Sequence, residues 1–428
     1  MLLFGRMLAI SIKSIFSDHW KSVKLELSRR YESSHWKSIV ESVEKMLSCR
    51  EPSNGYAEYI CTHCGTKKKC PFSCKGRFCT SCGKKYTDEW VQRTVDELID
   101  VPHRHLVLTI AEELREVFFW HRSLLKVMMD CAAKTALEVL QSQKSEAVAG
   151  ILVVVHTFGR DLKFNPHVHL LMTEGGLRGG QWEPIPFLPY ALLRKKWQYH
   201  LLTEIKGCWA KSREDSRFID RLFKGNGQGF YVNGESQMSS SRYAARYIGR
   251  YIARPALAEH KITSYDGQGV TFWYESHEEK RRVYRRLEAR EFIERLIDHI
   301  PLKGFKMVRH YGLYARRSKG TAWEVLSKCR NFLQQSFAFL SAPAKVLGWR
   351  QRLIQTFGQD PLLCPRCGEE MELWRIWHPR YGDLFDLGRD SPGVELFDEK
   401  NSAEGKAQGF LEGSRWASQL SLFPVYHS

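Results

Sequence analysis

Residues 150–173, GILVVVHTFGRDLKFNPHVHLLMT, contain two apolar runs joined by a short polar link. The first run, residues 150–158, and the second, residues 167–173, have the length and the aliphatic content of buried β-strands. A hairpin that closes through residues 158–166 would set these two strands side by side. The stretch therefore predicts a buried pair of antiparallel strands.

Histidines on these two strands form a candidate metal site. Because side chains alternate along a strand, His167 and His169 share one face, while Val168 and Leu170 point to the other. Two imidazoles so arranged suit a divalent metal, and the hairpin would bring His156 close as a third ligand. Such a metal keeps positions open for water or substrate. The alternative for His156 is a hydrogen-bonded histidine of the core.

A second informative stretch, SRYAARYIGRYIARP (241–255), predicts an amphipathic helix. The face opposite its apolar side is basic, with an arginine at every fourth position: Arg242, Arg246, Arg250 and Arg254. Such a face suits a phosphate backbone, so these arginines are candidates for DNA binding. Tyr247 and Tyr251 lie at the border of the two faces, where a hydroxyl could reach a phosphorus atom. The alternative is a basic helix whose tyrosines only pack.

Six of the twelve cysteines fall between residues 61 and 82. The pairs Cys61-x2-Cys64 and Cys79-x2-Cys82 predict one tetrahedral zinc site, which is structural because four thiolates leave no open position. Three nearby residues could replace a ligand or bind a second ion: Cys70, Cys74 and His63. The later pair Cys364 and Cys367 is half a metal site, which His378 could help to complete.

Composition indicates the partner class. The 428 residues carry a net charge of +17, which favours nucleic acid over an anionic membrane surface. The length suggests two or three domains. No run of eighteen apolar residues occurs, and residues 1–16 are typical of an amphipathic helix rather than a signal peptide. We therefore expect a cytoplasmic protein with reduced thiols, and an acidic, poorly ordered tail after about residue 379.

Taken together, these motifs resemble a known family. NPHVHLL resembles the HUH motif (His, hydrophobic, His) of rolling-circle nucleases, and YIGRY resembles the paired tyrosines of two-tyrosine HUH transposases. CTHCG…FSCKGRFCTSCG resembles the amino-terminal zinc-binding domain of these transposases. YDGQGVTFWY and HIPLKGFKMVRHYGLYA resemble further blocks of rolling-circle insertion-sequence transposases, so that the resemblance covers about residues 15–375.

The resemblance implies an α+β fold, with an antiparallel sheet flanked by helices and a small zinc-ribbon-like cysteine module before it. It implies four consecutive parts: a helical region (1–55), a zinc-binding domain (56–100), an HUH nuclease domain (101–340) and a carboxy-terminal region (341–428). It also implies a structural Zn²⁺ and a catalytic Mg²⁺ or Mn²⁺.

For function, the resemblance implies a transposase that nicks and joins single-stranded DNA through a 5′-phosphotyrosine, with Tyr247 and Tyr251 as nucleophiles. Its partners would be single-stranded DNA at the element ends and target DNA, with no membrane and no small-molecule substrate; the oligomeric state stays open. One alternative is a plasmid replication initiator or relaxase with the same HUH chemistry. Another is a non-catalytic zinc-containing protein that binds nucleic acid.

Overall fold

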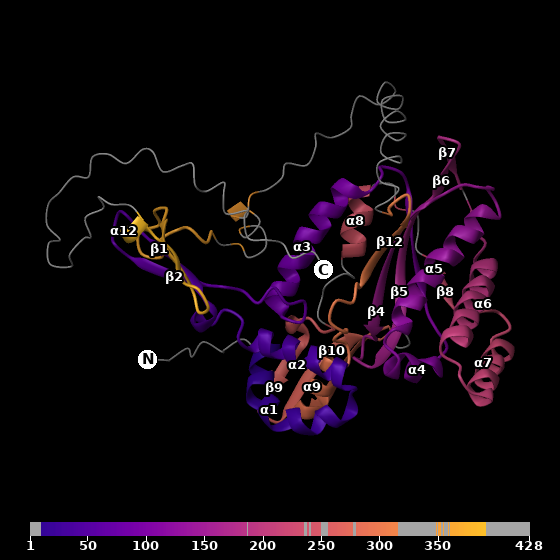
Figure 1. Ribbon diagram of the computed structural model, residues 1–428, viewed down its shortest axis with the longest axis horizontal. Helices are drawn as coiled ribbons and strands as arrows, with labels where there is room; N and C mark the ends of the chain where they lie inside the picture. The colour runs from indigo at the N-terminus through magenta and orange to yellow at the C-terminus, as the bar shows by residue number, and fades with distance from the viewer. Residues whose placement is uncertain are drawn as a thin grey trace. The chain divides into compact units, whose positions relative to one another are not determined.

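The computed structural model describes residues 10–185, 187–234, 238, 241–249, 256–276, 280–315, 348, 350–351, 354, 358 and 360–390 (Figure 1). The chain divides into two compact units, each made of separate stretches. Unit 1 contains Met1–Cys49 and Ser73–Pro361, and unit 2 contains Arg50–Phe72 and Leu362–Ser428. These units cut across the four consecutive parts expected from the sequence, and that division stays a prediction. The start of the expected poorly ordered acidic tail is ordered, which corrects that expectation, because Gly382–Asp386 form a strand and Leu387–Asp390 a short helix; the rest of the tail lies outside the described residues.

A five-stranded antiparallel sheet organises unit 1. Its strand order is β12 (Val308–Gly312), β4 (Gly150–Phe158), β5 (Phe164–Thr173), β3 (His103–Leu108) and β8 (Val232–Gly234). The expected hairpin is confirmed, because β4 and β5 pair in antiparallel register with His156 opposite His167. β5 is therefore the central strand of the sheet.

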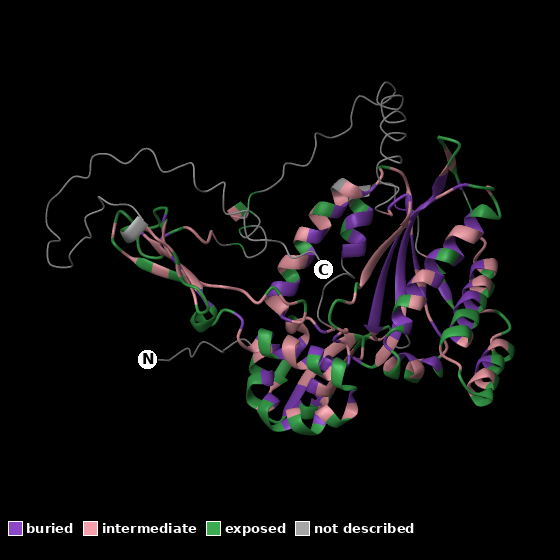
Figure 2. Cartoon of the chain, viewed as in Figure 1, coloured by how far each residue is buried: buried purple, intermediate pink, exposed green. Residues whose placement is uncertain are grey.

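Helices cover one face of this sheet and form the larger core (Figure 1). They are α4 (Leu114–Trp120), α5 (Leu124–Gln141), α6 (Tyr190–Cys208) and α7 (Arg213–Gly225). Side chains that alternate along β4 and β5 point into this core: Ile151, Val153, Val155, Val168, Leu170 and Met172. Both strands are buried over most of their length (Figure 2). The small ribbon of β6 (Gly175–Arg178) and β7 (Gln181–Pro184) follows β5.

The opposite face of the sheet packs against α3 (Thr80–Glu97) and α8 (Ser241–Gly249). Ala244, Ala245 and Ile248 of α8 are fully buried with Leu152 and Val154 of β4. Alanine side chains allow the helix to lie close to the strands. The expected apolar face of the tyrosine segment is thus confirmed within α8, and the helix lies on the same face as the histidines.

The amino-terminal helices α1 (Ile12–Leu27) and α2 (Ser33–Leu47) form a second core in unit 1. They pack with α9 (Ala289–Ile297) and a three-stranded sheet of β9 (Ile262–Tyr265), β10 (Gly269–Glu275) and β11 (Arg282–Glu288). Two 3₁₀ turns, η1 (Ser28–Arg30) and η3 (Glu259–Lys261), complete this part.

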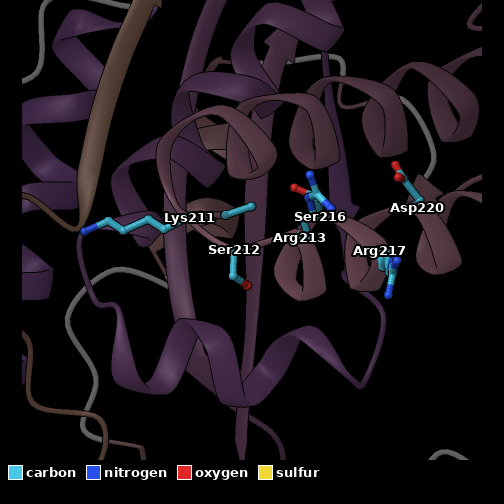
Figure 3. A pocket seen from close by; sticks show the side chains of 7 residues that line it. Lys211, Ser212, Arg213, Ser216, Arg217 and Asp220 are labelled. Atoms are coloured by element: carbon cyan, nitrogen blue, oxygen red, sulfur yellow. The ribbon is translucent and has the colours of Figure 1, made fainter.

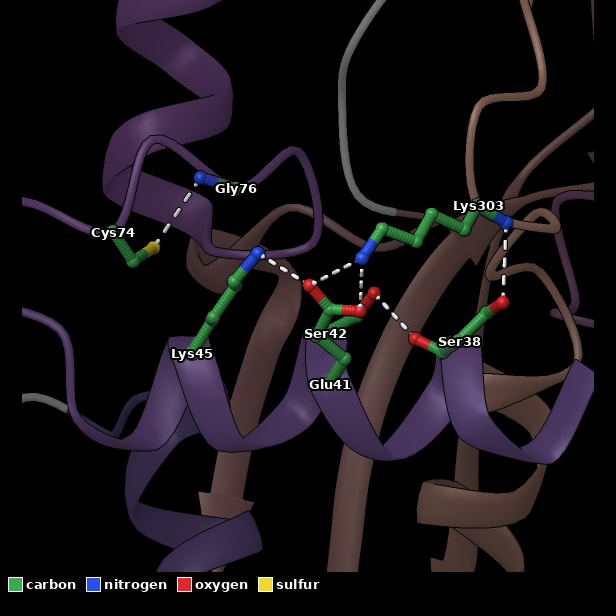
Figure 4. Close-up of polar contacts among 7 residues, drawn as sticks. All are labelled: Ser38, Glu41, Ser42, Lys45, Cys74, Gly76 and Lys303. Carbon is green, nitrogen blue, oxygen red and sulfur yellow. Dashed lines mark hydrogen bonds and ion pairs between the residues drawn. The ribbon is translucent and has the colours of Figure 1, made fainter.

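Glu41 on α2 ties this helix to the loop after α9. Its carboxylate accepts hydrogen bonds from Lys45 and Lys303, and the Lys303 amide donates to Ser38 Oγ (Figure 4). The two lysines lower the pKa of Glu41 to about 2. The carboxylate therefore stays charged over the whole neutral range.

Unit 2 is a thin four-stranded antiparallel sheet in the order β14 (Gly382–Asp386), β13 (Glu372–His378), β1 (Tyr56–Ile60) and β2 (Lys67–Pro71). The turn η2 (Pro52–Asn54) precedes β1, and the short helix α12 (Leu387–Asp390) follows β14. Every strand pair described in either unit is antiparallel, which together with the helices confirms the α+β class. Among the described helices, none combines the length and the apolar character that spanning a membrane requires.

Candidate active site

The structure brings the three candidate histidines together on the α8 face of the sheet. One ring nitrogen each of His156, His167 and His169 lies within 4.8 Å of the others. His167 and His169 are two residues apart on β5, and their Nε2 atoms are 3.1 Å apart. His156 comes from β4, and its ring centroid lies 4.6 Å from that of His169. Strand alternation and the β4–β5 register together create this group.

The spacing of these nitrogens suits a shared divalent ion. Two ligands at about 2.1 Å from a metal and at right angles to each other lie about 3 Å apart, close to the separation of the two Nε2 atoms. The other nitrogen of His167, Nδ1, lies 2.8 Å from the Asn165 carbonyl oxygen, to which it can donate. A backbone acceptor of this kind fixes the ring orientation of metal-binding histidines.

Burial favours the neutral form of His167 and His169, which is the form that binds metals. Burial lowers the pKa of His167. Burial also lowers the pKa of His169 well below its ordinary value, and the neighbouring histidines add to the effect because a second positive charge beside them is unfavourable. A metal cation could bind the unprotonated nitrogens of these three histidines.

His105, on β3, is a residue that the sequence analysis missed. Its Nε2 lies 3.0 Å from His169 Nδ1, and the two rings stack with centroids 5.1 Å apart. A signal was available, because His103-Arg104-His105 repeats the His-x-His spacing on another strand. His103 itself has a different role, since it contacts Val101 O and the Tyr314 hydroxyl.

Tyr247 of α8 lies next to this histidine group. Its side chain is buried, and its ring centroid is 5.0 Å from that of His105. Tyr243, one turn earlier, is 59% exposed. Arg246 is exposed, as a DNA-binding residue must be.

Tyr251, Arg250 and Arg254 lie outside the described residues, and so does the side chain of Arg242. Their expected roles stay predictions.

The cysteines form two groups of four, which corrects the expectation of one site built from Cys61, Cys64, Cys79 and Cys82. Cys79 and Cys82 join two other cysteines in unit 1, and Cys61 and Cys64 join two others in unit 2. The full sets are Cys49, Cys74, Cys79 and Cys82, and Cys61, Cys64, Cys364 and Cys367. The expected pairing failed because nearness in sequence does not determine which cysteines meet in the fold.

The first group, which we call cluster 1, is built around the start of α3. Cys82 Sγ lies 3.7 Å from Cys49 Sγ and 3.6 Å from Cys74 Sγ. The amide of Gly76 donates to Cys74 Sγ (Figure 4), and the amide of Cys74 donates to Cys49 Sγ. Cys74, which the sequence left open as a ligand, is thus a member of a group.

Cys70, His63 and His378 belong to neither cysteine group among the described residues. The expectation that one of them supplies a ligand therefore finds no support in this part of the chain.

Comparison with known proteins shows what the chain is similar to. Residues 150–321 match a family described as "Putative transposase", and residues 15–110 match one described as "Transposase zinc-binding domain". Both matched stretches are thus similar to transposases of insertion sequences of the IS91/IS801 kind. The first match spans the histidine group and α8, and the second spans cluster 1 and β3.

Two curated proteins are similar to this chain over most of its length. It is 29% identical over 346 residues to the transposase for insertion sequence element IS801 of Pseudomonas savastanoi pv. phaseolicola, covering 78% of this chain and 82% of that protein. It is 24% identical over 341 residues to "Putative transposase y4qJ" of Sinorhizobium fredii, covering 74% and 84%. No solved structure matches the chain. These matches confirm the resemblance found in the sequence.

The chain also has a surface hollow of about 400 Å³ at the start of α7 (Figure 3). Polar and basic side chains line it, among them Lys211, Ser212, Arg213 and Arg217. α7 belongs to the helical layer on the other face of the sheet from α8. The hollow is therefore separate from the histidine group.

Proposed function

We propose that this transposase nicks and rejoins single-stranded DNA through a 5′-phosphotyrosine, with a divalent ion held by His156, His167 and His169. The observation that carries this proposal is the short connection from the histidine group to Tyr247. His105 hydrogen-bonds to His169 and packs against the Tyr247 ring, so a phenol lies beside a potential metal site. A phosphate bound at the site would have a nucleophile at hand.

A divalent ion bound by the three imidazoles would polarise the scissile phosphate and neutralise charge that develops on its oxygens. The residues of this chain do the rest. The Tyr247 oxygen attacks phosphorus and loses its proton to solvent, while the bond from phosphorus to the 3′ oxygen breaks. The departing oxygen takes up a proton and becomes a free 3′-hydroxyl, and the 5′-phosphate stays on tyrosine.

A second tyrosine would allow the two DNA ends to be processed without hydrolysis of the first phosphotyrosine. Tyr251 follows Tyr247 by four residues, and such residues lie on adjacent turns where the helix continues. One tyrosine holds the first DNA end while the other acts at the second, so no intermediate is lost to water. Arg246, exposed on α8, binds the DNA backbone, and the neighbouring arginines of the repeat extend this contact.

A covalent-adduct assay tests this proposal. The full chain is incubated with Mn²⁺ and a labelled single-stranded oligonucleotide from an element end, and the adduct is mapped by mass spectrometry. Tyr247→Phe keeps the ring and deletes the reacting oxygen, so we expect the adduct at Tyr247 to disappear and DNA binding to persist. Tyr243→Phe is the matched control and should keep the adduct. An adduct on Tyr243, or one that survives in Tyr247→Phe/Tyr251→Phe, contradicts the assignment.

A replication initiator or relaxase would form the same adduct, and the family match favours the transposase. Joining separates the two. A transposase transfers the bound strand to an unrelated target, whereas a relaxase or initiator recloses its own nick. A zinc protein without catalysis would form no adduct at all, which makes the same assay decisive for that alternative.

A further inference from the structure

The second cysteine group, which we call cluster 2, unites stretches of chain about 300 residues apart. We propose that Cys61, Cys64, Cys364 and Cys367 bind a zinc ion of their own, and that this ion is the core of unit 2. The zinc-binding-domain match ends at residue 110, so it assigns no role to Cys364 or Cys367. The inference rests on the geometry of the cysteines and is independent of the proposed nicking chemistry.

The sulfur positions fit a tetrahedral zinc ion. Cys61 Sγ and Cys64 Sγ each lie 3.5 Å from Cys367 Sγ, and Cys64 Sγ lies 3.6 Å from Cys364 Sγ. Four sulfurs at about 2.3 Å from a central ion are about 3.8 Å apart, whereas bonded sulfurs lie about 2.05 Å apart. The group therefore has the spacing of a thiolate cage.

Two turns of the same kind supply these sulfurs. In CTHCGT, the Cys61 amide donates to Thr66 O and the Gly65 amide donates to Cys61 O, at 2.9 and 2.8 Å. In CPRCGE, the Cys364 amide donates to Glu369 O and the Gly368 amide donates to Cys364 O, at 2.8 and 3.0 Å. Each turn ends on a glycine in the left-handed region, with φ of +70° at Gly65 and +79° at Gly368.

The third Cys-x-x-Cys-Gly stretch is built differently. Cys79 immediately precedes α3, and Cys82 and Gly83 lie in the first turn of that helix. The turns at Cys61 and Cys364 are thus the matching pair, although they are far apart in sequence. Each turn supplies two sulfurs, and together they supply the four ligands of a tetrahedral zinc ion.

Unit 2 needs such an ion because its apolar core is very small. The buried cluster among its described residues consists of Cys61, Cys364 and Met371, with Tyr59 and Cys64 packed against it. Its sheet has four short strands, and α12 is only four residues long. Small domains with so little apolar burial rely on a metal or on disulfides to fold. Here the cysteines themselves occupy the centre of the cluster.

Zinc content of the full-length, reduced protein tests the proposal. We expect two zinc ions per chain in the wild type and one in Cys364→Ser/Cys367→Ser. The matched control is Cys70→Ser, because Cys70 lies on β2 of the same unit but outside cluster 2, and this variant should keep two ions. One ion in the wild type, or two in the double variant, would overturn the proposal.

A measurement on the wild type alone covers the case in which the double variant does not fold. X-ray absorption at the zinc edge should show only sulfur neighbours, four per ion at about 2.3 Å. Nitrogen or oxygen in the first shell would contradict an all-cysteine site. A chain that holds two zinc ions but forms no DNA adduct would refute the proposed function and leave this inference standing.

Discussion

The variant His105→Phe tests whether His105 positions the metal ligand His169, because it leaves the tyrosine Tyr247 unchanged. Phenylalanine keeps an aromatic ring between His169 and Tyr247 but removes the 3.0 Å hydrogen bond between His105 Nε2 and His169 Nδ1. His105 is 1% exposed, so solvent cannot readily replace that hydrogen bond. His169 would then hold its ring less firmly, and its Nε2 would bind a divalent ion more weakly.

The size of the effect follows from the role of this hydrogen bond. Hydrogen bonds to the far nitrogen of a metal-binding histidine are typically worth about 10- to 100-fold in metal affinity, or about 1.4–2.7 kcal/mol. We therefore expect the Mn²⁺ concentration for half-maximal adduct formation to rise 10- to 100-fold in His105→Phe. At saturating Mn²⁺ the rate should recover to within a few-fold of the wild type, because Tyr247 is unchanged.

The assay is adduct formation over a Mn²⁺ titration, with His103→Phe as the matched control. His103 is a buried histidine on the same strand, but its hydrogen-bond partners are Val101 and Tyr314. Its replacement should lower stability without moving the metal requirement. An unchanged Mn²⁺ requirement in His105→Phe would refute the reasoning, and so would an equal shift in both variants.

Three further predictions concern pH, packing and metal choice. Burial lowers the pKa of His35 to about 4, so between pH 6.5 and 4 the unfolded chain binds a proton there that the folded chain does not. The free energy of unfolding should therefore decrease as the pH is lowered through this window, by up to about 3 kcal/mol. Urea titrations at pH 7 and pH 5 measure this decrease, which should be smaller in His35→Gln than in the wild type. Equal decreases in the two proteins would contradict this. Ala245→Leu overpacks the contact between α8 and the sheet, so thermal unfolding should show a loss of about 1–3 kcal/mol and the adduct yield should drop; no change in either would mean that the helix is not held there. Because imidazole ligands suit Mn²⁺ better than Mg²⁺, Mn²⁺ should support adduct formation at least as well, and a clear preference for Mg²⁺ would argue against a three-histidine site.

Local patterns predicted the centre of the fold. The aliphatic runs at 150–158 and 167–173 and the alternation of His167 and His169 depend only on strand periodicity, which the sequence displays directly. The apolar face of α8 follows in the same way from helical periodicity. These features were predicted because each is determined by neighbours within a few residues.

Contacts between distant segments were not predicted. His105 reaches His169 only because β3 pairs with β5, and no local pattern states that pairing. Cys61 meets Cys364 because β1 pairs with β13, and these strands lie about 300 residues apart in the sequence. The cysteine spacing indicated a zinc-binding domain, in agreement with the family match. Spacing alone, however, pairs Cys61 and Cys64 with the next Cys-x-x-Cys in the sequence, Cys79 and Cys82, and these two belong to cluster 1.

The positions of the cysteines in the sequence also determine the order in which the two clusters can be completed while the chain is synthesised. Cluster 1 has all its ligands once residue 82 has left the ribosome, whereas Cys64 must wait for Cys367, 303 residues later. At about 5–20 residues per second this wait lasts roughly 15–60 s. During that time the Cys61–Cys64 turn is an open half-site that can take a metal with the wrong partners. An ion bound early at cluster 1 would remove Cys79 and Cys82 from that competition and so favour correct assembly of cluster 2.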